Sequence, residues 1–380
     1  MFYIDNNEDL INICAEIKKH ANIIAVDTEF TKQTEYFPTL SIIQISFFNG
    51  EVIKNCIFDV LVKNIDLSPL KEIFDNEKIK KVFHSCSQDL ETLYTVFDKI
   101  PSGVEDTQIM AEFCGMKSNL SYTDLIKEAL GIIIKKDRQL QVSDWKARPL
   151  SDEQLKYAAN DVDYLLELYI KLLQKLDLNK NFKYYRSEME ERYGQNMIEK
   201  TIQESSWRRI RFRIGNKTNV YMNTLKAVCR LRESLAIKNN VIKNIIMLDS
   251  DLKIILANQP KTLEEFHSLI KEEKETKKKV KTLRENFAKG CVKIFNEISE
   301  DEIEEKPYIT ELKNKIMSQK LEEVNDYIIS ECKIMDINPE IIQNKIDLSS
   351  YISDSENLED LFSTWKIKLF GKRIKEIKER

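Results

Sequence analysis

The chain has 380 residues, of which 42% are hydrophobic and 32% are charged, with only 8 glycines and 7 prolines. This composition excludes a disordered protein, and the length favours two or three folded domains, at about 150 residues per domain. Residues 1–175 carry 20 Lys and Arg against 28 Asp and Glu, or −8, and residues 176–380 carry 39 against 35, or +4. The acidic half favours a cation site and the basic half favours contact with a polyanion, although scattered surface charge would give the same totals.

Membrane segments, disulfides and zinc sites are not expected. No stretch approaches 18 consecutive apolar residues, and the opening MFYIDNNEDL lacks the basic and apolar regions of a secretory signal. The 7 cysteines are widely spaced without a CxxC pair, and there are only 3 histidines. We therefore expect a cytoplasmic protein with reduced thiols.

The first 175 residues are predicted to form an α/β domain. An apolar run at 23–27 reads as a buried strand, and runs at 40–48 and 51–59 read as two more, with the hairpin signal Asn49-Gly50 between them. Further elements follow in chain order: a helix at 68–76, a strand at 80–84, a helix at 87–98, a strand ending at 105–107, and helices at 107–115, 119–130 and 151–175. A mixed sheet flanked by helices is the expected architecture.

The rest of the chain is predicted to be all-α and to form two small bundles. Beyond residue 176 no convincing strand is visible, and the charge run at 271–285 is typical of the solvated face of a helix. The segment WRRIRFRI at 207–214 mixes aromatic and basic side chains. That mixture suits contact with an RNA backbone, and it equally suits an ordinary exposed basic helix.

Four acids occur where these elements could bring them together. Asp27 and Glu29 lie two apart at the end of a buried strand, so both side chains project from one face of the sheet. Asp89 lies in the first turn of a helix, and Tyr157 and Asp161 are four residues apart on one helix face. Each has an ordinary explanation when taken singly. Together the acids predict a site for hard divalent cations such as Mg²⁺, which prefer oxygen ligands.

These residues lie in motifs that resemble a known family. VDTEF at 26–30, HSCSQDL at 84–90 and YAANDV at 157–162 resemble the three motifs of the DEDD exonuclease superfamily, in the subtype whose third motif contains tyrosine. The sequence between these motifs is similar to ribonuclease D at residues 36–46, 106–115 and 143–151. The resemblance covers about 20–175 and implies a ribonuclease H-like exonuclease domain with a mixed sheet.

The helical half carries a weaker resemblance. Residues 223–266 are similar to the helicase-and-RNase-D C-terminal (HRDC) domain, and LFSTWKIKLFG at 361–371 resembles the end of a second, degenerate copy. QLQV at 139–142 lacks the acidic and threonine residues often found at that place in the family. The resemblance predicts four ranges: an exonuclease domain at 1–175, a helical linker at 176–214, an HRDC domain at 215–300 and an HRDC-like domain at 301–380.

The resemblance also implies a mechanism with two divalent cations, Mg²⁺ or Mn²⁺, and cleavage from the 3′ end. Asp27 and Asp161 would hold the ion that activates water, and Asp27, Glu29 and Asp89 would hold the ion beside the departing 3′ oxygen. The Tyr157 hydroxyl would orient the attacking water, because a reference pKa of about 10 makes it a poor base at pH 7.

Substrate contacts are predicted at four residues. The resemblance places Thr28 and Phe30 beside the terminal nucleotide. His84 has a structural or a substrate-positioning role, and Arg148 either contacts phosphate or forms a local salt bridge. A fifth polar residue, Gln44, is expected to be a hydrogen-bonded core amide rather than a substrate contact.

The expected activity is 3′-5′ exoribonuclease action on RNA 3′ ends, with release of mononucleotides and tRNA precursors as substrates by family analogy. A monomer without an obligate protein partner is expected. Two alternatives stay open: a 3′-5′ DNA exonuclease in repair, because recognition of the 2′-OH leaves no short motif, and a catalytically silent RNA-binding protein.

Overall fold

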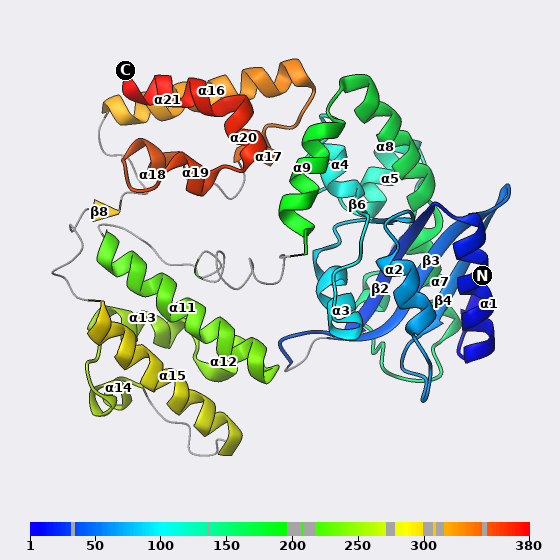
Figure 1. The fold of residues 1–380 in the computed structure, drawn as a ribbon, viewed down its shortest axis with the longest axis horizontal. Coiled ribbons are helices and arrows are strands. Elements are labelled where there is room, and N and C mark those ends of the chain that lie inside the picture. Colours follow the sequence, from blue (N-terminus) through cyan, green and yellow to red (C-terminus); the bar gives the residue numbers. More distant parts are fainter. Residues whose placement is uncertain are drawn as a thin grey trace. The chain divides into compact units, whose positions relative to one another are not determined.

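The computed structural model describes two compact units (Figure 1). The described residues are 1–31, 35–135, 137–195, 207, 217–270, 278–298, 307–308, 315–343 and 348–380. The first unit lies within Met1–Gln33, Pro38–Gln195 and Tyr327–Asn344, and the second within Thr34–Phe37, Asn196–Asp326 and Lys345–Arg380. The basic aromatic segment at 207–214 lies outside the described residues except for Trp207.

A mixed six-stranded sheet forms the centre of the first unit and confirms the predicted α/β class. Its strands are β1 (Phe2–Ile4), β2 (Ile23–Thr31), β3 (Thr39–Asn49), β4 (Val52–Asp59), β5 (Lys80–Phe83) and β6 (Val104–Asp106). They lie in the order β1-β4-β3-β2-β5-β6. β2, β3 and β4 form the predicted antiparallel meander, whereas β2, β5 and β6 run parallel.

The hairpin between β3 and β4 turns one residue later than its sequence signal. Asn49 pairs with Val52, so the two loop residues are Gly50 and Glu51. Gly50 has φ +69, a conformation that glycine adopts without the steric cost of a side chain. The sequence reading overlooked β1, because a strand of three residues is too short to show alternation.

Helices flank the sheet; two of them were not predicted, and one predicted helix is divided. They are α1 (Asn7–His20), α2 (Ser68–Asp75), α3 (Ser87–Phe97), α4 (Thr107–Glu112), α5 (Tyr122–Leu130), α6 (Arg138–Gln141), α7 (Asp152–Asp163), α8 (Leu165–Asn179) and α9 (Phe182–Tyr193). α1 and α6 were not predicted, and the single helix predicted at 151–175 is two helices, α7 and α8. The helix breaks at Tyr164, whose amide donates to the Tyr122 hydroxyl at 3.2 Å.

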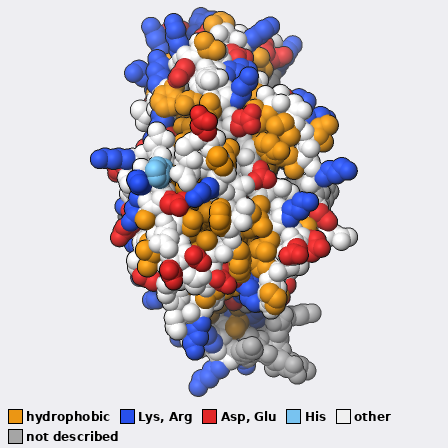
Figure 2. Space-filling view, turned by 90° about the vertical axis from the view of Figure 1, so that its right-hand side faces the viewer, with side chains coloured by type: hydrophobic (Ala, Val, Ile, Leu, Met, Phe, Trp, Pro, Cys, Tyr) orange, Lys and Arg blue, Asp and Glu red, His pale blue; other side chains and the backbone are white. Residues whose placement is uncertain are grey.

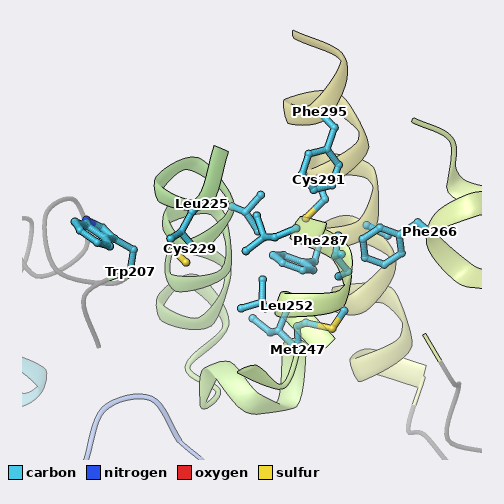
Figure 3. Close-up of a cluster of buried hydrophobic side chains, with 14 of the residues drawn as sticks. Trp207, Leu225, Cys229, Met247, Leu252, Phe266, Phe287, Cys291 and Phe295 are labelled. Carbon is cyan, nitrogen blue, oxygen red and sulfur yellow. The ribbon is translucent and has the colours of Figure 1, made fainter. Parts of the chain in front are cut away.

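The second unit has its own apolar core, formed between the two long helices α11 (Asn219–Asn239) and α15 (Lys278–Glu297) and three shorter ones (Figure 3). The shorter helices are α12 (Lys243–Ile246), α13 (Asp249–Asn258) and α14 (Leu263–Leu269). Leu225 and Cys229 of α11 face Phe287 and Cys291 of α15 across this core, and all four are buried. Burial of apolar area on this scale is what holds short helices together.

The remaining C-terminal elements are α16 (Lys315–Met335), α17 (Glu340–Gln343), α18 (Leu348–Ile352), α19 (Leu358–Leu361), α20 (Thr364–Lys366), a π-helical turn η2 (Ile367–Gly371) and α21 (Lys372–Glu379). The expectation of no strand beyond 176 was wrong, because β7 (Lys217–Thr218) pairs antiparallel with β8 (Pro307–Tyr308). Two-residue strands carry no sequence period by which they could be recognised.

The compact units differ from the predicted ranges at several places: Thr34–Phe37 belong to the second unit, and most of the ranges 215–300 and 301–380 fall in one unit. The first unit continues past 175 through α9, where the buried Tyr185 donates to Glu105 Oε2 at 2.7 Å. It also includes Tyr327–Asn344 from the range predicted as a second helical domain. There, the Asn338 amide donates to the Glu112 carbonyl at 2.8 Å, and Asn338 Nδ2 donates to the Met116 carbonyl at 2.7 Å. The HRDC identity of the helical ranges stays a prediction.

The surface shows no separation of charge on the face drawn in Figure 2, where basic, acidic and apolar side chains are interspersed. Across the parts of the chain that the structure describes, no helix has both the length and the apolar character needed to cross a bilayer.

Candidate active site

β2 delivers the first two acids of the site. Asp27 and Glu29 alternate with the buried Val26 and Thr28 along this strand, so the two acids share one face. The pairing of β2 with β3 shifts register between Glu29 and Phe30. Such a bulge bends and twists a strand locally, and here it lies directly beside the two acids.

α7 delivers the third acid and the tyrosine. Ser151 and Gln154 cap this helix reciprocally: Ser151 Oγ accepts from the Gln154 amide at 3.2 Å, and Gln154 Oε1 accepts from the Ser151 amide at 3.0 Å. Its buried side packs Tyr157, Ala158 and Ala159 into a core cluster with strand residues and Trp145. The small alanines allow the helix to approach the sheet closely, which brings Asp161 to β2.

Three of the four predicted acids converge. Carboxylate oxygens of Asp27, Glu29 and Asp161 all lie within 4.8 Å of one another. Oxygens that share one divalent ion at about 2.0–2.5 Å lie at most about 4–5 Å apart, so these three fit a common cation. The donor set is entirely carboxylate, which suits a hard ion such as Mg²⁺ or Mn²⁺ rather than zinc.

Tyr157 borders this cluster with its hydroxyl protonated. Burial raises its pKa above the usual value, and the charges of Asp161, Glu29 and Asp27 raise it further. A phenol with a raised pKa donates a hydrogen bond at neutral pH and does not act as a base. Its role in orienting water stays a prediction.

Asp89 lies apart from the three-acid cluster. Its Oδ1 accepts from the Thr28 hydroxyl at 2.5 Å, and its side chain is buried. Burial raises the pKa of Asp89 to about 7, against the opposing effect of the Thr28 hydrogen bond. Asp89 meets β2 at Thr28, the residue between Asp27 and Glu29, and it is not one of the three acids whose oxygens lie within 4.8 Å of one another. Its role as a metal ligand stays a prediction.

Of the four predicted substrate contacts, three have other contacts in the structure. The Thr28 hydroxyl is engaged by Asp89. The ring nitrogens of His84 lie 3.0 Å from Thr107 Oγ1 and 3.1 Å from the Leu120 carbonyl, contacts that suit a structural role, and its substrate contact stays a prediction. Phe30 is half-buried, and its stacking on a nucleotide stays a prediction.

Arg148 forms the local salt bridge rather than offering a free cation. Its Nε and Nη2 donate to the two oxygens of Asp59 at 2.5 and 2.8 Å, and its Nη1 donates to the Trp145 carbonyl at 2.7 Å. Asp59 also accepts from the Tyr3 hydroxyl at 2.5 Å. This fork ties the segment before α7 to the sheet, so Arg148 contributes to the placement of Tyr157 and Asp161. The predicted phosphate contact has no support from these contacts.

Two residues near the site behave differently from their sequence interpretation. Gln44 lies opposite Asp27 in the strand register and is fully buried. Within the described structure neither polar atom of its amide has a hydrogen-bond partner, so the expected satisfied amide is not found.

Tyr122 was not identified from the sequence as a residue near the site. Burial raises the pKa of Tyr122, and the charges of Asp161 and Asp27 raise it further. The sequence around Tyr122 contains no motif that would identify it, because only the folded chain brings it near the acids.

Similarity to known proteins agrees with this geometry. Residues 1–177 match the family model described as 3′-5′ exonuclease. The chain is 33% identical over 264 residues to ribonuclease D of Sphingobium indicum, covering 69% of this chain and 66% of the relative. It is 30% identical over 254 residues to ribonuclease D of Bartonella henselae, covering 66% of this chain and 60% of the relative. The match thus spans less than two thirds of the length of these two relatives.

A solved structure resembles nearly the whole chain. The crystal structure of Escherichia coli RNase D, described as an exoribonuclease involved in structured RNA processing, is similar with a TM-score of 0.75 and 26% identity. That similarity covers 99% of this chain and 98% of the solved one, so it includes the helical half as well as the sheet. Because curated relatives named ribonuclease D match about two thirds of the chain and this solved structure matches nearly all of it, this chain belongs to the ribonuclease D family.

Proposed function

We propose that the protein is a 3′-5′ exoribonuclease that hydrolyses RNA phosphodiesters from the 3′ end and releases nucleoside 5′-monophosphates. The observation that carries the proposal is the convergence of Asp27, Glu29 and Asp161 within 4.8 Å beside Tyr157. Exonucleases of this family depend on divalent metal ions, and an all-carboxylate cluster suits that dependence. We further propose two ions, Mg²⁺ or Mn²⁺, with Asp89 completing the second position.

Divalent cations supply charge stabilisation at phosphorus and lower the pKa of water when bound. The residues of the chain do the rest. Asp27, Glu29 and Asp161 would hold the cations beside the phosphodiester, and the protonated Tyr157 hydroxyl would orient the attacking water. α7 and β2 are rigid elements, so these groups are in place before the RNA arrives.

RNA 3′ ends of structured precursors, tRNA among them, are the proposed substrates. This proposal rests on similarity to ribonuclease D rather than on a contact in the structure. The helical ranges 215–300 and 301–380 are proposed to be HRDC-type modules that tether RNA. A cytoplasmic location and a monomeric state stay predictions.

The direct test offers the purified chain matched RNA and DNA oligonucleotides of one sequence, each labelled at its 5′ end, with Mn²⁺ or Mg²⁺. We expect a ladder of products shortened from the 3′ end, faster on RNA, that disappears with chelator. Asp161→Asn is the matched control, because it removes one charge with little change in shape.

Each alternative has its own outcome in that experiment. A clear preference for DNA ends would favour the DNA exonuclease. Binding of RNA with no Mn²⁺-dependent shortening would favour the silent RNA-binding protein, and either result would overturn the proposal. A 5′-to-3′ order of products would also contradict it.

A further inference from the structure

The turn that leads into α3 has an unfavourable backbone. β5 ends at Phe83, and α3 begins at Ser87, so His84, Ser85 and Cys86 make the connection. Ser85 has φ +61, a left-handed conformation that residues other than glycine rarely adopt. Cys86, at the start of the helix, provides no side-chain cap. Something outside the turn must therefore hold it in this shape.

The carboxylate of Asp106 holds this turn. Asp106 ends β6, pairs with Phe83 of β5 and is fully buried. Its Oδ1 accepts from the Ser85 amide at 2.9 Å, and its Oδ2 accepts from the Cys86 amide at 3.0 Å. The same carboxylate caps α4 by accepting from the Gln108 amide at 2.9 Å.

One more donor completes the set around this carboxylate. The Tyr193 hydroxyl of α9 donates to Asp106 Oδ2 at 3.2 Å. Hydrogen bonds from amides to an ionised carboxylate are about twice as strong as those between neutral groups. Two such bonds to consecutive amides fix both the position and the direction of the chain as it enters α3.

The direction of α3 decides where Asp89 lies. Asp89 is the third residue of this helix, and its carboxylate meets Thr28 of β2 at 2.5 Å. The two hydrogen bonds to Asp106 hold the amides just before the helix, so their loss would let the first turn rotate and move the Asp89 carboxylate relative to β2. The three clustered acids come from β2 and α7, whereas Asp89 is carried by α3.

We propose that Asp106 is a positioning residue of the exonuclease site: through the Ser85 and Cys86 amides it aims Asp89 at the place of the second divalent cation. The inference rests on the proposed function, in which Asp89 is a metal ligand. Asp106 itself touches neither substrate nor cation. Outer-shell groups of this kind typically change metal affinity by about 10- to 100-fold when they are replaced.

The adjacent residue provides a matched control. Glu105 is a buried carboxylate on the same strand, but its oxygens accept from Tyr185 at 2.7 Å and from Arg186 at 2.9 Å. These partners belong to α9 and not to the turn before α3. Tyr185 also accepts from the Asp106 amide at 3.1 Å, so Glu105→Gln perturbs the surroundings of Asp106 but leaves the bonds from the turn to the Asp106 carboxylate in place.

The experiment compares the full chain with Asp106→Asn and Glu105→Gln at a temperature where circular dichroism shows all three folded. Mn²⁺ binding is measured by electron paramagnetic resonance, and the Mn²⁺ concentration for half-maximal cleavage is measured on one RNA oligonucleotide. We expect Asp106→Asn to weaken binding at the lower-affinity Mn²⁺ site about 10-fold or more. High Mn²⁺ should restore its rate, the KM for RNA should stay unchanged, and Glu105→Gln should bind Mn²⁺ like the wild type.

Equal Mn²⁺ affinity in folded Asp106→Asn and in the wild type would overturn the inference, and so would an equal loss in Glu105→Gln. If Asp106→Asn does not fold, Asp106→Glu is tested instead, because it keeps the charge but shifts the carboxylate oxygens. An Mn²⁺ affinity equal to that of the wild type in Asp106→Glu would then overturn the inference. Intact Mn²⁺ binding without any nuclease activity would instead overturn the proposed function.

Discussion

At the scale of single residues, the site depends on charges that repel one another in the absence of a cation. Asp27, Glu29 and Asp161 place their oxygens within 4.8 Å. Like charges this close disfavour joint ionisation unless a cation neutralises them. Removing one charge should therefore harm catalysis without harming the fold.

Asp161→Asn is expected to lower kcat on the order of 10³-fold or more, because a ligand of the activating ion is lost. Its melting temperature in chelator should equal or exceed that of the wild type, since repulsion in the cluster is relieved. Single-turnover cleavage and thermal unfolding check the two halves of this prediction. Wild-type turnover would show that the ligand assignment is wrong.

Tyr157→Phe should retain a fraction of activity. The variant loses the hydroxyl that orients water but keeps the ring packed near Trp145, with ring centroids 6.1 Å apart in the wild type. We expect kcat to fall about 10- to 100-fold and the KM for RNA to stay unchanged. This loss of rate is at or below the smallest that is typical when a positioned proton-transfer group is removed. A pH–rate profile with a different limb from the wild type would instead assign Tyr157 a proton-transfer role.

Arg148→Ala tests the structural role of the predicted substrate contact. The variant leaves Asp59, whose side chain is 1% exposed, without its charged partner, which should cost about 3 kcal/mol of unfolding free energy. Arg148→Lys should recover little of this, because an ammonium cannot replace the guanidinium fork. Urea unfolding measures the loss of stability. If the affinity for RNA falls while the stability is unchanged, the result would instead support the predicted contact between Arg148 and phosphate.

The same ion pair predicts a dependence on pH. Burial alone would raise the pKa of Asp59, but the hydrogen bonds from Arg148 and Tyr3 outweigh it and lower the pKa below its usual value. A lowered folded-state pKa gives stability that is present above the unfolded pKa of about 4 and is lost as the pH falls through the folded value. Unfolding free energies below pH 4 should therefore decline less in Arg148→Ala than in the wild type.

At the scale of elements, sequence patterns located the structures that carry most of the site. The apolar run at 40–48 and the Asn-Gly signal were sufficient for β3 and β4, and the four-residue spacing was sufficient to place Tyr157 and Asp161 together. The break between α7 and α8 was not predictable, because it follows from a hydrogen bond with Tyr122, which is 42 residues away. Local periodicity contains no information on such a partner.

β5 contains a buried lysine with a consequence for stability. Lys81 is fully buried, and its ammonium donates to the Asn76 carbonyl at 2.6 Å. Burial lowers the pKa of Lys81 to about 7, although the charges of Asp75 and Glu77 oppose this. Since the unfolded chain keeps this group charged up to a pKa of about 10.4, stability should rise with pH between about 7 and 10.

Lys81→Met should remove this dependence and stabilise the protein at pH 7 by about 1–3 kcal/mol, because a buried polar group without full compensation is replaced by an apolar one of similar shape. Denaturant unfolding of both proteins at pH 7 and pH 9.5 checks the sign. If the wild type gains no stability over this interval relative to Lys81→Met, the lysine is charged in the folded state.

At the scale of the whole molecule, sequence order and compact units do not coincide. Residues 327–344 lie in the chain between two segments of the second unit, yet they belong to the unit that contains the sheet. The three motifs predicted the exonuclease domain because they occur in this chain in the order that is typical of the family. They could not predict this return of the chain, since it depends on Asn338 and on carbonyl groups of the 112–116 segment more than 200 residues away.

Asn338→Ala is expected to lower the temperature at which nuclease activity is lost, although residue 338 lies outside the predicted exonuclease range. The variant leaves the Met116 carbonyl without its donor, a cost of about 1–2 kcal/mol. Asn258→Ala is the control, because its side chain donates only locally, to the Ile254 carbonyl at 2.8 Å in the other unit. Equal inactivation temperatures for the wild type and Asn338→Ala would show that the C-terminal segment does not support the site.

The measurement that tests the central claim most directly follows Mn²⁺ binding and RNA shortening together in the wild type and in Asp161→Asn. The account predicts that the wild type binds Mn²⁺ and shortens 5′-labelled RNA from its 3′ end, and that Asp161→Asn, still folded, loses both the tighter Mn²⁺ signal and the shortening. Shortening that persists in Asp161→Asn, or in the wild type with excess chelator, would contradict the account.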